Sequence, residues 1–351
     1  MGNQSIQIGP FSIGDGLKPV IIAEIGVNHN GSVELAKELI VAAKNTGADI
    51  VKFQTFKAEN LAAKDTPKVD YQKKNASNET ESHFEMLKKL ELSYADTKML
   101  KEFCEHENIL FMSTPYDIEG VEFLDSIGTL AFKGASADLV DYRLQEAMRK
   151  TGKPIIQSVG MTRIDELELF LQQYPETYPL ILLQCTSNYP SDPRNSNLNT
   201  IKMMREKYGI LSGFSDHTPN SLSAVLSVAA GACVIERHFT LDCTMDGPDH
   251  KASTEPGAFK AYVDEIQEAY EIMGRAEKVV AEEEMGMRRV SRKGVYLKRD
   301  VSIGENLSDD LFYFRRPSTE VSPLELPSLM DKVFNCDIKC DSALKREYFE
   351  N

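Results

Sequence analysis

The stretch VIERHFTLDCTMDGPDHKASTEP, residues 234–256, passes from a short apolar run into a loop dense in charge. The run ends in residues 236–238 (ERH), and the acidic loop that follows contains glycine and proline. Such an ending is typical of a buried strand that delivers polar side chains to a cleft. The preceding run, residues 210–217 (ILSGFSDH), also ends in a histidine. Two consecutive strands that each end in histidine indicate a metal or acid/base site at one rim of a sheet.

Outward from this stretch, short β-rich runs alternate with amphipathic helical stretches along most of the chain. We predict strands over residues 20–27, 49–56, 109–115, 130–136, 154–160, 180–186, 210–217 and 233–240. We predict helices over residues 33–46, 94–107, 118–126, 142–151, 164–174, 197–208, 220–230 and 257–273. Eight β-then-α units in succession predict an α/β fold of the (β/α)8 TIM barrel type, because a doubly wound sheet usually has fewer strands.

The barrel accounts for residues 1–275 in this prediction, with a short N-terminal hairpin over residues 5–14 that closes its bottom. Residues 57–82 are a polar excursion, which we predict to be a mobile or substrate-gated loop over the rim. A charged linker is predicted over residues 276–290, with an exposed helix over residues 276–293 as the alternative. Residues 291–351, with short β runs and turn signals, are expected to form a small β-rich domain that ends in a helical tail. A unit of that size is marginal alone and is expected to lean on another surface.

Composition limits the function classes. A net charge of -14 argues against nucleic-acid and anionic-membrane partners, both of which need basic faces. The six cysteines are scattered without the spacing of a zinc module, so we expect free thiols and a cytoplasmic location. The first residues show neither the basic region nor the apolar core of a secretion signal. No apolar run approaches the roughly 18–20 residues of a membrane span.

Polar side chains recur at or near the predicted end of every barrel strand, where barrel enzymes keep their active sites. In strand order these are Glu24, Lys52, Gln54, Thr114, Lys133, Ser136, Ser158, Ser187, Tyr189, Ser215, His217 and His238. One strand with a polar tip carries little information. The same ending on all eight strands is difficult to explain by packing alone, and it indicates an active site.

The residue types suggest roles, each with a plainer alternative. His217 and His238 on adjacent strands are candidate ligands of a Lewis-acid or substrate-binding ion, or else two unrelated hydrogen-bonded histidines. The lysines and hydroxyls form a candidate cradle for a carboxylate and a phosphate, although serine and threonine also cap helices. Glu24 is a candidate general base or charge stabiliser, or the salt-bridge partner of a lysine. Asp249 either binds sugar hydroxyls or caps the next helix, and Arg316 has the pattern of ordinary surface.

Several motifs carry a resemblance to a known family. AEIGVNHNGS, DIVKFQTFKAENL, MSTPYD, FKGAS, GFSDHT, ERHFTLD and GPDHKASTEP resemble the bacterial sialic acid synthase family of N-acetylneuraminate and legionaminate synthases. The segment SRKGVYLKRDVSIGENLSDDLFYFRRP is similar to the C-terminal antifreeze-like domain, of the β-clip type, in those enzymes. The resemblance covers about residues 20–345, so it implies the barrel and the small domain together.

The resemblance implies condensation of phosphoenolpyruvate with an N-acetylmannosamine-type sugar, releasing phosphate and forming a nonulosonic acid. It implies that His217 and His238 bind Mn2+ or Mg2+ and, together with Glu24, carry catalysis. Phosphoenolpyruvate would be bound by Lys52, Thr114, Lys133, Ser136, Ser158, Ser187 and Ser215. The sugar would be bound by Gln54, Asp138, Tyr189, Asp249 and Arg316. Arg316 would reach the partner subunit's barrel, which implies a domain-swapped homodimer.

Four positions depart from the usual residues of the family: Ala137, Val159, Ser187 and Ser318. The first three bear on substrate preference and the last on the loop that presents Arg316. We expect an N-acetylneuraminate synthase, with a legionaminate synthase that uses 2,4-diacetamido-2,4,6-trideoxymannose as the alternative and a pseudaminate synthase less favoured. Two readings from other classes remain, a catalytically silent carbohydrate-binding barrel and a metal-dependent aldolase that uses pyruvate. The presence of both histidines, both lysines and Glu24 argues against the silent barrel, and the aldolase would need neither the phosphate cradle nor the swapped arginine.

Overall fold

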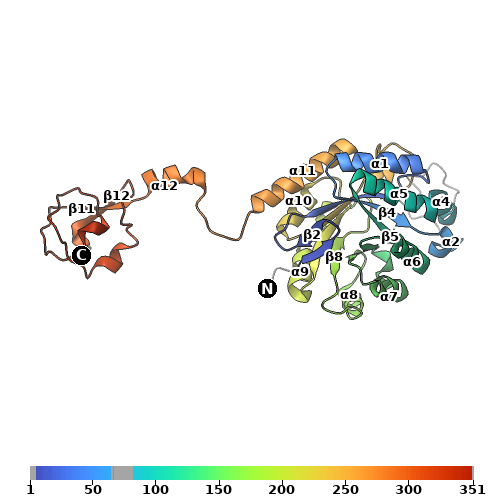
Figure 1. The fold of residues 1–351 in the computed structure, drawn as a ribbon, viewed down its shortest axis with the longest axis horizontal. Helices are drawn as coiled ribbons and strands as arrows, with labels where there is room; N and C mark the ends of the chain where they lie inside the picture. Colours follow the sequence, from blue (N-terminus) through green and yellow to red (C-terminus); the bar gives the residue numbers. More distant parts are fainter. Residues whose placement is uncertain (1–4, 65, 67–81, 350–351) are drawn as a thin grey trace. The chain divides into compact units, whose positions relative to one another are not determined.

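The computed structural model describes residues 5–64, 66 and 82–349. The chain divides into two compact units, residues 1–275 and residues 276–351. The first unit is built around one parallel sheet and the second around a small antiparallel one. Each unit is described by itself below, with the labels of Figure 1.

The first unit is a nearly closed barrel of eight parallel strands (Figure 1). The strand order is β5-β4-β3-β10-β9-β8-β7-β6, and the two end strands, β5 and β6, also lie next to each other. The strands are β3 Val20–Gly26, β4 Ile50–Thr55, β5 Leu110–Pro115, β6 Phe132–Gly134, β7 Ile155–Ser158, β8 Leu180–Cys185, β9 Leu211–Asp216 and β10 Val234–His238. Every predicted barrel strand is present, and the predicted TIM-type barrel is confirmed.

Helices follow the strands and cover the outside of the barrel. They are α1 Val33–Asn45, α5 Tyr94–Glu107, α6 Ile118–Ser126, α7 Tyr142–Lys150, α8 Ile164–Leu171, α9 Asn199–Tyr208, α10 Leu222–Ala229 and α11 Pro256–Met273. Local chemistry sets several of their ends. The Ser32 hydroxyl accepts a hydrogen bond from the first turn of α1, and the Ser93 hydroxyl does the same for α5. Gly47, with φ of +88°, lets the chain leave α1 toward β4.

Side-chain alternation along the strands sorts the core into two layers. Odd-numbered positions of β3, such as Ile21 and Ile25, join the larger apolar cluster with the helices. Even-numbered positions, such as Val20 and Ile22, join a second cluster inside the barrel. The next inward position on β3 is Glu24, so the apolar filling of the barrel gives way to polar groups toward the strand ends. The same change occurs from Ile50 to Lys52 on β4.

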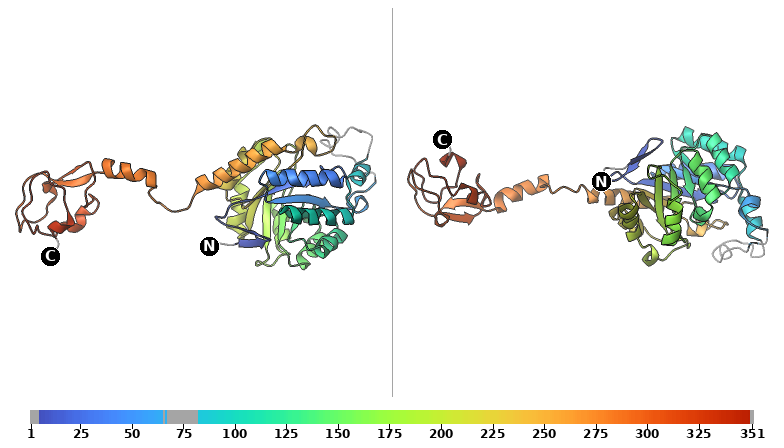
Figure 2. Two further views of the ribbon diagram at one scale, coloured as in Figure 1. Left: turned by 45° about the horizontal axis from the view of Figure 1, so that its top comes forward. Right: turned by 90° about the horizontal axis from the view of Figure 1, so that it is seen from below.

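The N-terminal hairpin closes the opposite end of the barrel, as predicted. Strands β1 Ser5–Ile8 and β2 Phe11–Gly14 pair antiparallel. Their Ile6, Ile8 and Ile13 side chains pack into the inner cluster. Both views of Figure 2 place this hairpin and the short helices α2 and α4 at opposite ends of the barrel. The hairpin therefore seals the bottom, and the polar strand ends open on the other side.

The segment after β4, predicted as a polar loop over residues 57–82, contains more helix than expected. Residues 58–61 form the short helix α2 Ala58–Leu61, and a second helix that the sequence analysis missed, α4 His83–Leu90, follows the excursion. Both helices contribute to one small apolar cluster, which also contains Val27 and Phe56. The remainder of the predicted loop, residues 65 and 67–81, lies outside the described residues.

The second unit contains α12 Met285–Ser291 and the antiparallel strands β11 Gly294–Leu297 and β12 Phe312–Arg315. A separate apolar core is formed by residues that include Val295, Leu311 and Phe334. Helix α12 falls largely within the predicted linker. The predicted helical tail is wrong, because the described end of the chain has only the 3-10 turn Arg346–Tyr348. This segment is held instead by backbone bonds, including one from the Leu344 amide to the Val295 carbonyl.

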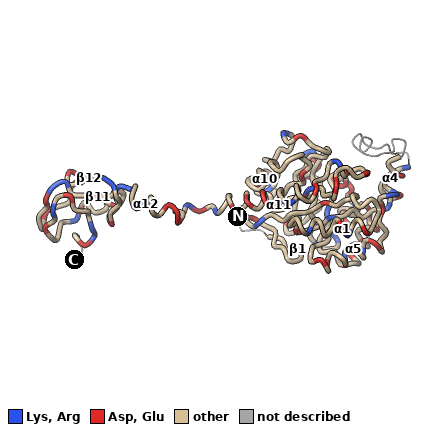
Figure 3. Tube along the Cα trace, turned by 90° about the horizontal axis from the view of Figure 1, so that it is seen from above, with Lys and Arg blue, Asp and Glu red and all other residues tan. Residues whose placement is uncertain are grey.

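Charge is distributed over both units. Figure 3 shows acidic and basic residues interspersed along the trace of each unit. Among the described residues, no helix combines the length and apolarity that a bilayer crossing needs.

Candidate active site

A cavity of about 500 Å³ opens at the carboxyl ends of the barrel strands. It is lined by these residues from the sequence analysis: Glu24, Lys52, Gln54, Thr114, Lys133, Ser136, Ser158, Ser187, Tyr189, Ser215, His217, His238 and Asp249. The parallel register explains the gathering, because inward positions at equivalent heights on neighbouring strands meet at one rim. The structure thus brings together residues that are more than 200 positions apart in the chain.

Four charged side chains form the floor of this cavity, and we call them the charge square: Glu24, Lys52, Glu236 and Lys133. Lys52 Nζ lies 2.8 Å from Glu24 Oε2 and 3.7 Å from Glu236 Oε2. Lys133 Nζ lies 3.8 Å from Glu236 Oε1. All four side chains are buried, so each charge depends on its neighbours for compensation. Glu24 therefore does form the salt bridge with a lysine that was one of its two predicted roles. Its carboxylate also lines the cavity, so the other role stays possible for it.

The pKa shifts in the charge square follow from burial and pairing. Burial opposes ionisation of Glu236, but Lys133 and Lys52 outweigh burial and lower its pKa to about 2. Burial raises the pKa of Glu24 despite the opposing effect of Lys52. Burial lowers the pKa of Lys133, and Glu236 only partly offsets that effect. Glu236 therefore stays ionised, and Glu24 is the carboxylate of the square that more readily takes a proton.

Hydroxyl groups surround the lysines. Lys52 Nζ donates to Thr114 Oγ1 at 3.2 Å, and Lys133 Nζ donates to Ser158 Oγ at 2.7 Å. Ser215 Oγ donates to Glu236 Oε1 at 2.9 Å. Ser136 precedes a 3-10 turn but makes no capping bond with its side chain, and its Oγ accepts from the Gly160 amide. These contacts favour an anion cradle over helix capping for this set of hydroxyls.

The two histidines face each other across the mouth of the cavity, with ring centroids 5.6 Å apart. Nδ1 of His217 lies 2.9 Å from the Thr186 carbonyl oxygen. Because a carbonyl only accepts, this contact places the proton on Nδ1 and leaves the Nε2 lone pair available. The buried Nδ1 of His238 has no hydrogen-bond partner, and burial together with His217 lowers the pKa of His238 to about 3. A neutral imidazole with an unused buried nitrogen is suited to bind a metal ion.

The donor set fits a divalent ion held by two imidazoles. Within the described ranges, no group of three or more His, Cys, Asp or Glu side chains is arranged to hold a metal. His217 and His238 would therefore leave most coordination positions open to water or substrate, as a catalytic site requires. Tyr189 packs against both rings, tilted to His217 at a centroid distance of 4.2 Å and edge-on to His238 at 5.4 Å.

Asp249 and Gln54 also line the cavity. Asp249 Oδ2 lies 4.0 Å from His238 Nδ1, and burial together with Glu24 raises the pKa of Asp249 to about 7. Gln54 Nε2 donates to Glu24 Oε1 at 3.0 Å and orients that carboxylate. Asp249 precedes a 3-10 turn without a capping bond from its side chain, so it is free to meet a ligand as a proton donor.

One residue expected at the site lies outside the cavity lining. Asp138 does not line the cavity, because it lies in the 3-10 turn Ala137–Val140 directly after the lining residues. Its Oδ2 is buried without a partner, and burial raises its pKa to about 6. Arg316 is exposed in the second unit, immediately after β12. The structure does not place it relative to the barrel.

Sequence reasoning missed Glu236 and Cys185, both of which line the cavity. The signal for Glu236 was present, because Glu236 and His238 are two positions apart on one strand and therefore share a face. Ser215 on β9 and His217 directly after it show the same spacing. Cys185 lies on the inward face of β8, with its Sγ 3.8 Å from His217 Nδ1.

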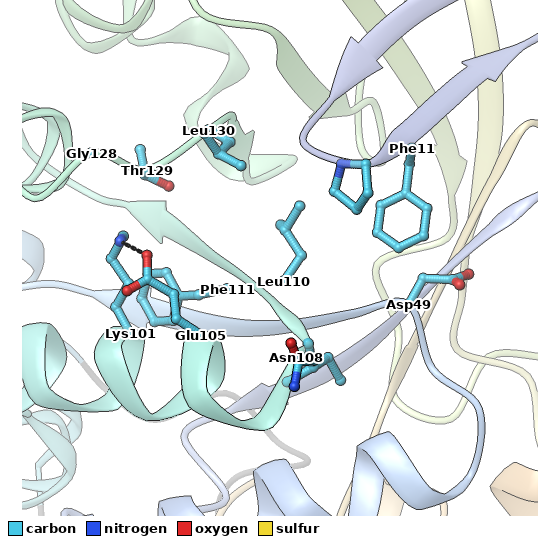
Figure 4. A pocket seen from close by; sticks show the side chains of 12 residues that line it. Phe11, Asp49, Lys101, Glu105, Asn108, Leu110, Phe111, Gly128, Thr129 and Leu130 are labelled. Atoms are coloured by element: carbon cyan, nitrogen blue, oxygen red, sulfur yellow. Dashed lines mark hydrogen bonds and ion pairs between the residues drawn. The ribbon is translucent and has the colours of Figure 1, made fainter.

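A second cavity, of about 320 Å³, lies near the barrel bottom and is lined mainly by apolar side chains (Figure 4). Its walls include Phe11 of the hairpin, Leu110 of β5 and Leu130 before β6. Its charged residues already have partners, since Lys101 pairs with Glu105 and the Asp49 carboxylate accepts from the Ile21 amide. This cavity offers no counterpart to the charge square.

Residues 39–278 match the NeuB family. The chain belongs to the NeuB family. A relative named N,N'-diacetyllegionaminic acid synthase, from Legionella pneumophila, is 37% identical over 96% of this chain and 98% of its own length. A relative named pseudaminic acid synthase, from Campylobacter jejuni, is 34% identical over 98% of this chain and 100% of its own length. This NeuB family membership confirms the resemblance to sialic acid synthases.

A solved structure agrees with the sequence matches. The N-acetylneuraminic acid (sialic acid) synthetase of Leptospira borgpetersenii, in complex with citrate, superposes with a TM-score of 0.72 at 31% identity. The match covers 81% of this chain and 95% of the other. The three proteins carry different product names, so membership in the NeuB family leaves the acceptor sugar open.

Proposed function

We propose that this NeuB family protein condenses phosphoenolpyruvate with an N-acylated amino sugar, forming a nonulosonic acid and inorganic phosphate. The observation that supports it best is the combination, in one cavity, of the charge square, its hydroxyl cradle and the paired histidines. A pyruvate aldolase would not need this cradle, and a silent binding barrel would not need buried carboxylates beside a two-histidine site.

The charge square suits an anion with two acidic groups. The phosphate and carboxylate of phosphoenolpyruvate would take Lys52 and Lys133 as counter-ions, with Thr114, Ser136, Ser158, Ser187 and Ser215 as hydrogen-bond donors. Because Glu24 is held beside Lys52, substrate charge near that lysine would weaken the pair and raise the affinity of Glu24 for a proton. Binding would thus convert Glu24 into the general base of the site.

In the proposed reaction, C3 of phosphoenolpyruvate forms a bond to the aldehyde carbon of the open-chain sugar, and water adds at C2. Glu24 takes one proton from that water and passes it to the former aldehyde oxygen, which becomes a hydroxyl. The remaining hydroxyl proton at C2 leaves with the phosphate as the C2–O bond breaks, giving the ketone of the product. Asp249, protonated up to about pH 7, donates a hydrogen bond on the sugar side of His238. A bound Mn2+ or Mg2+ would supply Lewis-acid polarisation of the aldehyde oxygen, and His217 and His238 would hold it.

The walls of the cavity bear on the choice of sugar. The side formed by α2, α4 and the β3 end is mostly apolar, with Val27, Leu61, Met86, Leu87 and Leu90, although Thr66 and His83 also line it. A 6-deoxy sugar with a second acetamido group presents methyl groups to such a wall, whereas the C6 hydroxyl of N-acetylmannosamine would lose hydration there. This wall and the 37% identity to a legionaminic acid synthase support 2,4-diacetamido-2,4,6-trideoxymannose over the N-acetylmannosamine expected from sequence alone.

The sugar preference is tested by phosphate release. Purified protein receives phosphoenolpyruvate, Mn2+ and one of the two sugars at equal concentration, and initial rates are measured with and without EDTA. We expect the trideoxy sugar to give a kcat/KM at least about tenfold higher, because one apolar group in a fitted pocket is worth roughly 1–3 kcal/mol. An equal or reversed preference would contradict the choice of sugar, and no phosphate from either would contradict the proposed reaction.

We further propose that the second unit is an antifreeze-like domain and that its Arg316 completes the sugar site of a partner subunit. Arg315 is occupied within its own unit, since its Nη2 lies 2.7 Å from Asp341 Oδ1 and its guanidinium packs 4.8 Å from the Tyr296 ring centroid. Arg316, next to it, is exposed and makes no hydrogen bond or ion pair within the described part of the chain. An unengaged arginine at that position is available to a ligand in trans.

Arg316→Ala is expected to raise the KM for the sugar about tenfold or more while leaving the KM for phosphoenolpyruvate within about twofold, because a lost charged hydrogen bond costs roughly 1.5–3 kcal/mol. Steady-state kinetics with each substrate varied in turn measure both constants. Arg315→Ala is the matched control, since it removes the same charge from a side chain tied to its own unit. Equal changes in both constants for Arg316→Ala would argue against the proposed role.

A further inference from the structure

The two histidines follow the point where β9 and β10 stop pairing. The parallel register of these strands matches Phe214 with Ile235, Ser215 with Glu236, and Asp216 with Arg237. The ladder ends with that last pair. His217 and His238 come next on each strand, so no ladder hydrogen bond between the strands holds them at their separation. Other contacts must do so.

A buried ion pair spans the two strands at their last matched position. Arg237 Nη1 lies 2.8 Å from Asp216 Oδ2, and the two side chains are 9% and 0% exposed. Both point to the outer face of the barrel, because their neighbours Ser215, Glu236 and the histidines line the cavity. The pair is therefore separate from the cavity but adjacent in sequence to each histidine.

Both carboxylate oxygens of Asp216 make further contacts. Asp216 Oδ1 accepts from the Thr218 amide at 2.8 Å and from its hydroxyl at 2.7 Å, which shapes the turn directly after His217. Asp216 Oδ2 also accepts from the Tyr262 hydroxyl of α11 at 3.0 Å. The carboxylate therefore holds the His217 turn, β10 and α11 at the same time.

Arg237 makes the corresponding contacts around His238. Its Nε donates to Thr254 Oγ1 at 2.6 Å, and the Thr254 amide donates to the His238 carbonyl at 2.9 Å. Its Nη1 also donates to the Asn220 carbonyl at 3.2 Å, and its guanidinium lies 4.7 Å from the Tyr262 ring centroid. One planar guanidinium thus connects the segment after His238 to the segment after His217.

We propose that the Asp216–Arg237 pair is a positioning device that fixes the separation of His217 and His238, and with it the affinity of the site for a divalent ion. The inference rests on the proposed metal role of the two histidines. Neither Asp216 nor Arg237 lines the cavity, so both would act only through their neighbours. A buried ion pair is by itself weak evidence for stability, because apolar or neutral replacements of such pairs are often as stable. Positional control is the function that this arrangement adds.

The test compares metal affinity with stability in a neutral double variant, Asp216→Asn with Arg237→Met. Asparagine keeps the acceptor for Thr218, methionine keeps the length of the arginine stem, and no unpaired buried charge remains. Mn2+ affinity is measured by calorimetry on the full chain without substrates, and Tm by thermal melting. We expect Tm to stay within a few degrees of wild type while the Kd for Mn2+ rises about 10- to 100-fold, the usual cost of losing an outer-shell partner.

Two further variants make the test decisive. Asp15→Ala removes the partner of Arg205, an ion pair of the N-terminal segment, and controls for a loss of stability without a change in metal affinity. Arg237→Lys keeps the charge but not the fork that joins Asp216 to Thr254. If the double variant does not fold, Arg237→Lys is tested in its place. We expect its Kd for Mn2+ to rise several-fold.

The outcomes separate the two claims. Wild-type affinity for Mn2+ in the double variant, or in Arg237→Lys if the double variant does not fold, overturns the positioning role and leaves the metal site intact. Absence of Mn2+ binding by wild type overturns the metal role and this inference with it. Loss of affinity in Asp15→Ala equal to that in the double variant would show that the effect follows general stability, which also overturns the inference.

Discussion

Alanine at His217 or at His238 is expected to lower kcat by about 1,000-fold or more and to abolish measurable Mn2+ binding. Two imidazoles are the only side-chain ligands proposed for the ion, so removal of one leaves a single ligand and no Lewis acid at the aldehyde. Turnover is measured by phosphate release, and metal binding by calorimetry on the same preparations.

His106→Ala serves as the matched control for this prediction. His106 is 82% exposed near the end of α5 and does not line the cavity, so its loss is expected to leave both measurements unchanged. Folding of the two site variants is checked by their Tm. Wild-type turnover in either variant, or wild-type turnover after exhaustive chelation, would contradict the assignment of the two histidines.

Glu236→Gln is expected to destabilise the free protein by about 3 kcal/mol at pH 7 and to reverse much of that loss on anion binding. Glutamine removes the only carboxylate within 4.0 Å of Lys133 in the described chain and one of the two near Lys52. Breaking a buried ion pair on one side leaves uncompensated charge, which costs several kcal/mol. Inorganic phosphate is therefore expected to raise the Tm of Glu236→Gln more than that of wild type.

The pH dependence of this difference has a definite sign. The pKa of Glu236 is depressed in the folded protein to about 2 from its ordinary 4.5. Its contribution is therefore fully present above about pH 4.5 and is lost as the pH falls toward 2. The gap in unfolding free energy between wild type and Glu236→Gln should shrink from about 3 kcal/mol at pH 7 to between about 1 and 2 kcal/mol at pH 3.

Glu107→Gln provides the control, because Glu107 pairs with Lys44 at 3.0 Å on the partly exposed surface. Exposed pairs are worth less than about 1 kcal/mol, so its loss should change neither Tm nor the response to phosphate appreciably. Chemical denaturation at several pH values gives the free energies. A Glu236→Gln protein as stable as wild type, with the same response to phosphate, would contradict the charge square as an anion site.

The barrel was predictable because its strands and helices have different periods. Runs such as residues 180–186 end in turn signals and alternate with helical repeats, and these local signals survive in one sequence. The residues at the strand ends could be predicted for the same reason, since a parallel barrel places all carboxyl ends at one rim. Lys52 and Lys133 are examples that the structure places in one cavity.

The residues and the helix that were missed needed either the alternation of a strand or tertiary contacts to be recognised. Glu236 was overlooked because it lies within a charged triplet and only the alternation of β10 shows that it faces inward with His238. Helix α4 was missed because its apolar residues Met86, Leu87 and Leu90 are explained by tertiary contacts with Val27 and Phe56. Asp138 follows the lining residues closely in sequence, but the 3-10 turn carries it away from the cavity.

The central claim is that the cavity joins the carbon skeletons of two substrates and releases phosphate from one of them. Its most direct test is mass spectrometry of a reaction with phosphoenolpyruvate whose bridging oxygen is 18O, Mn2+ and the trideoxy sugar. The account predicts one phosphate per nonulosonic acid, with all of the 18O in the phosphate, because the C2–O bond breaks. Product whose C2 oxygen carries the 18O, or phosphate released without a new carbon–carbon bond, would contradict it.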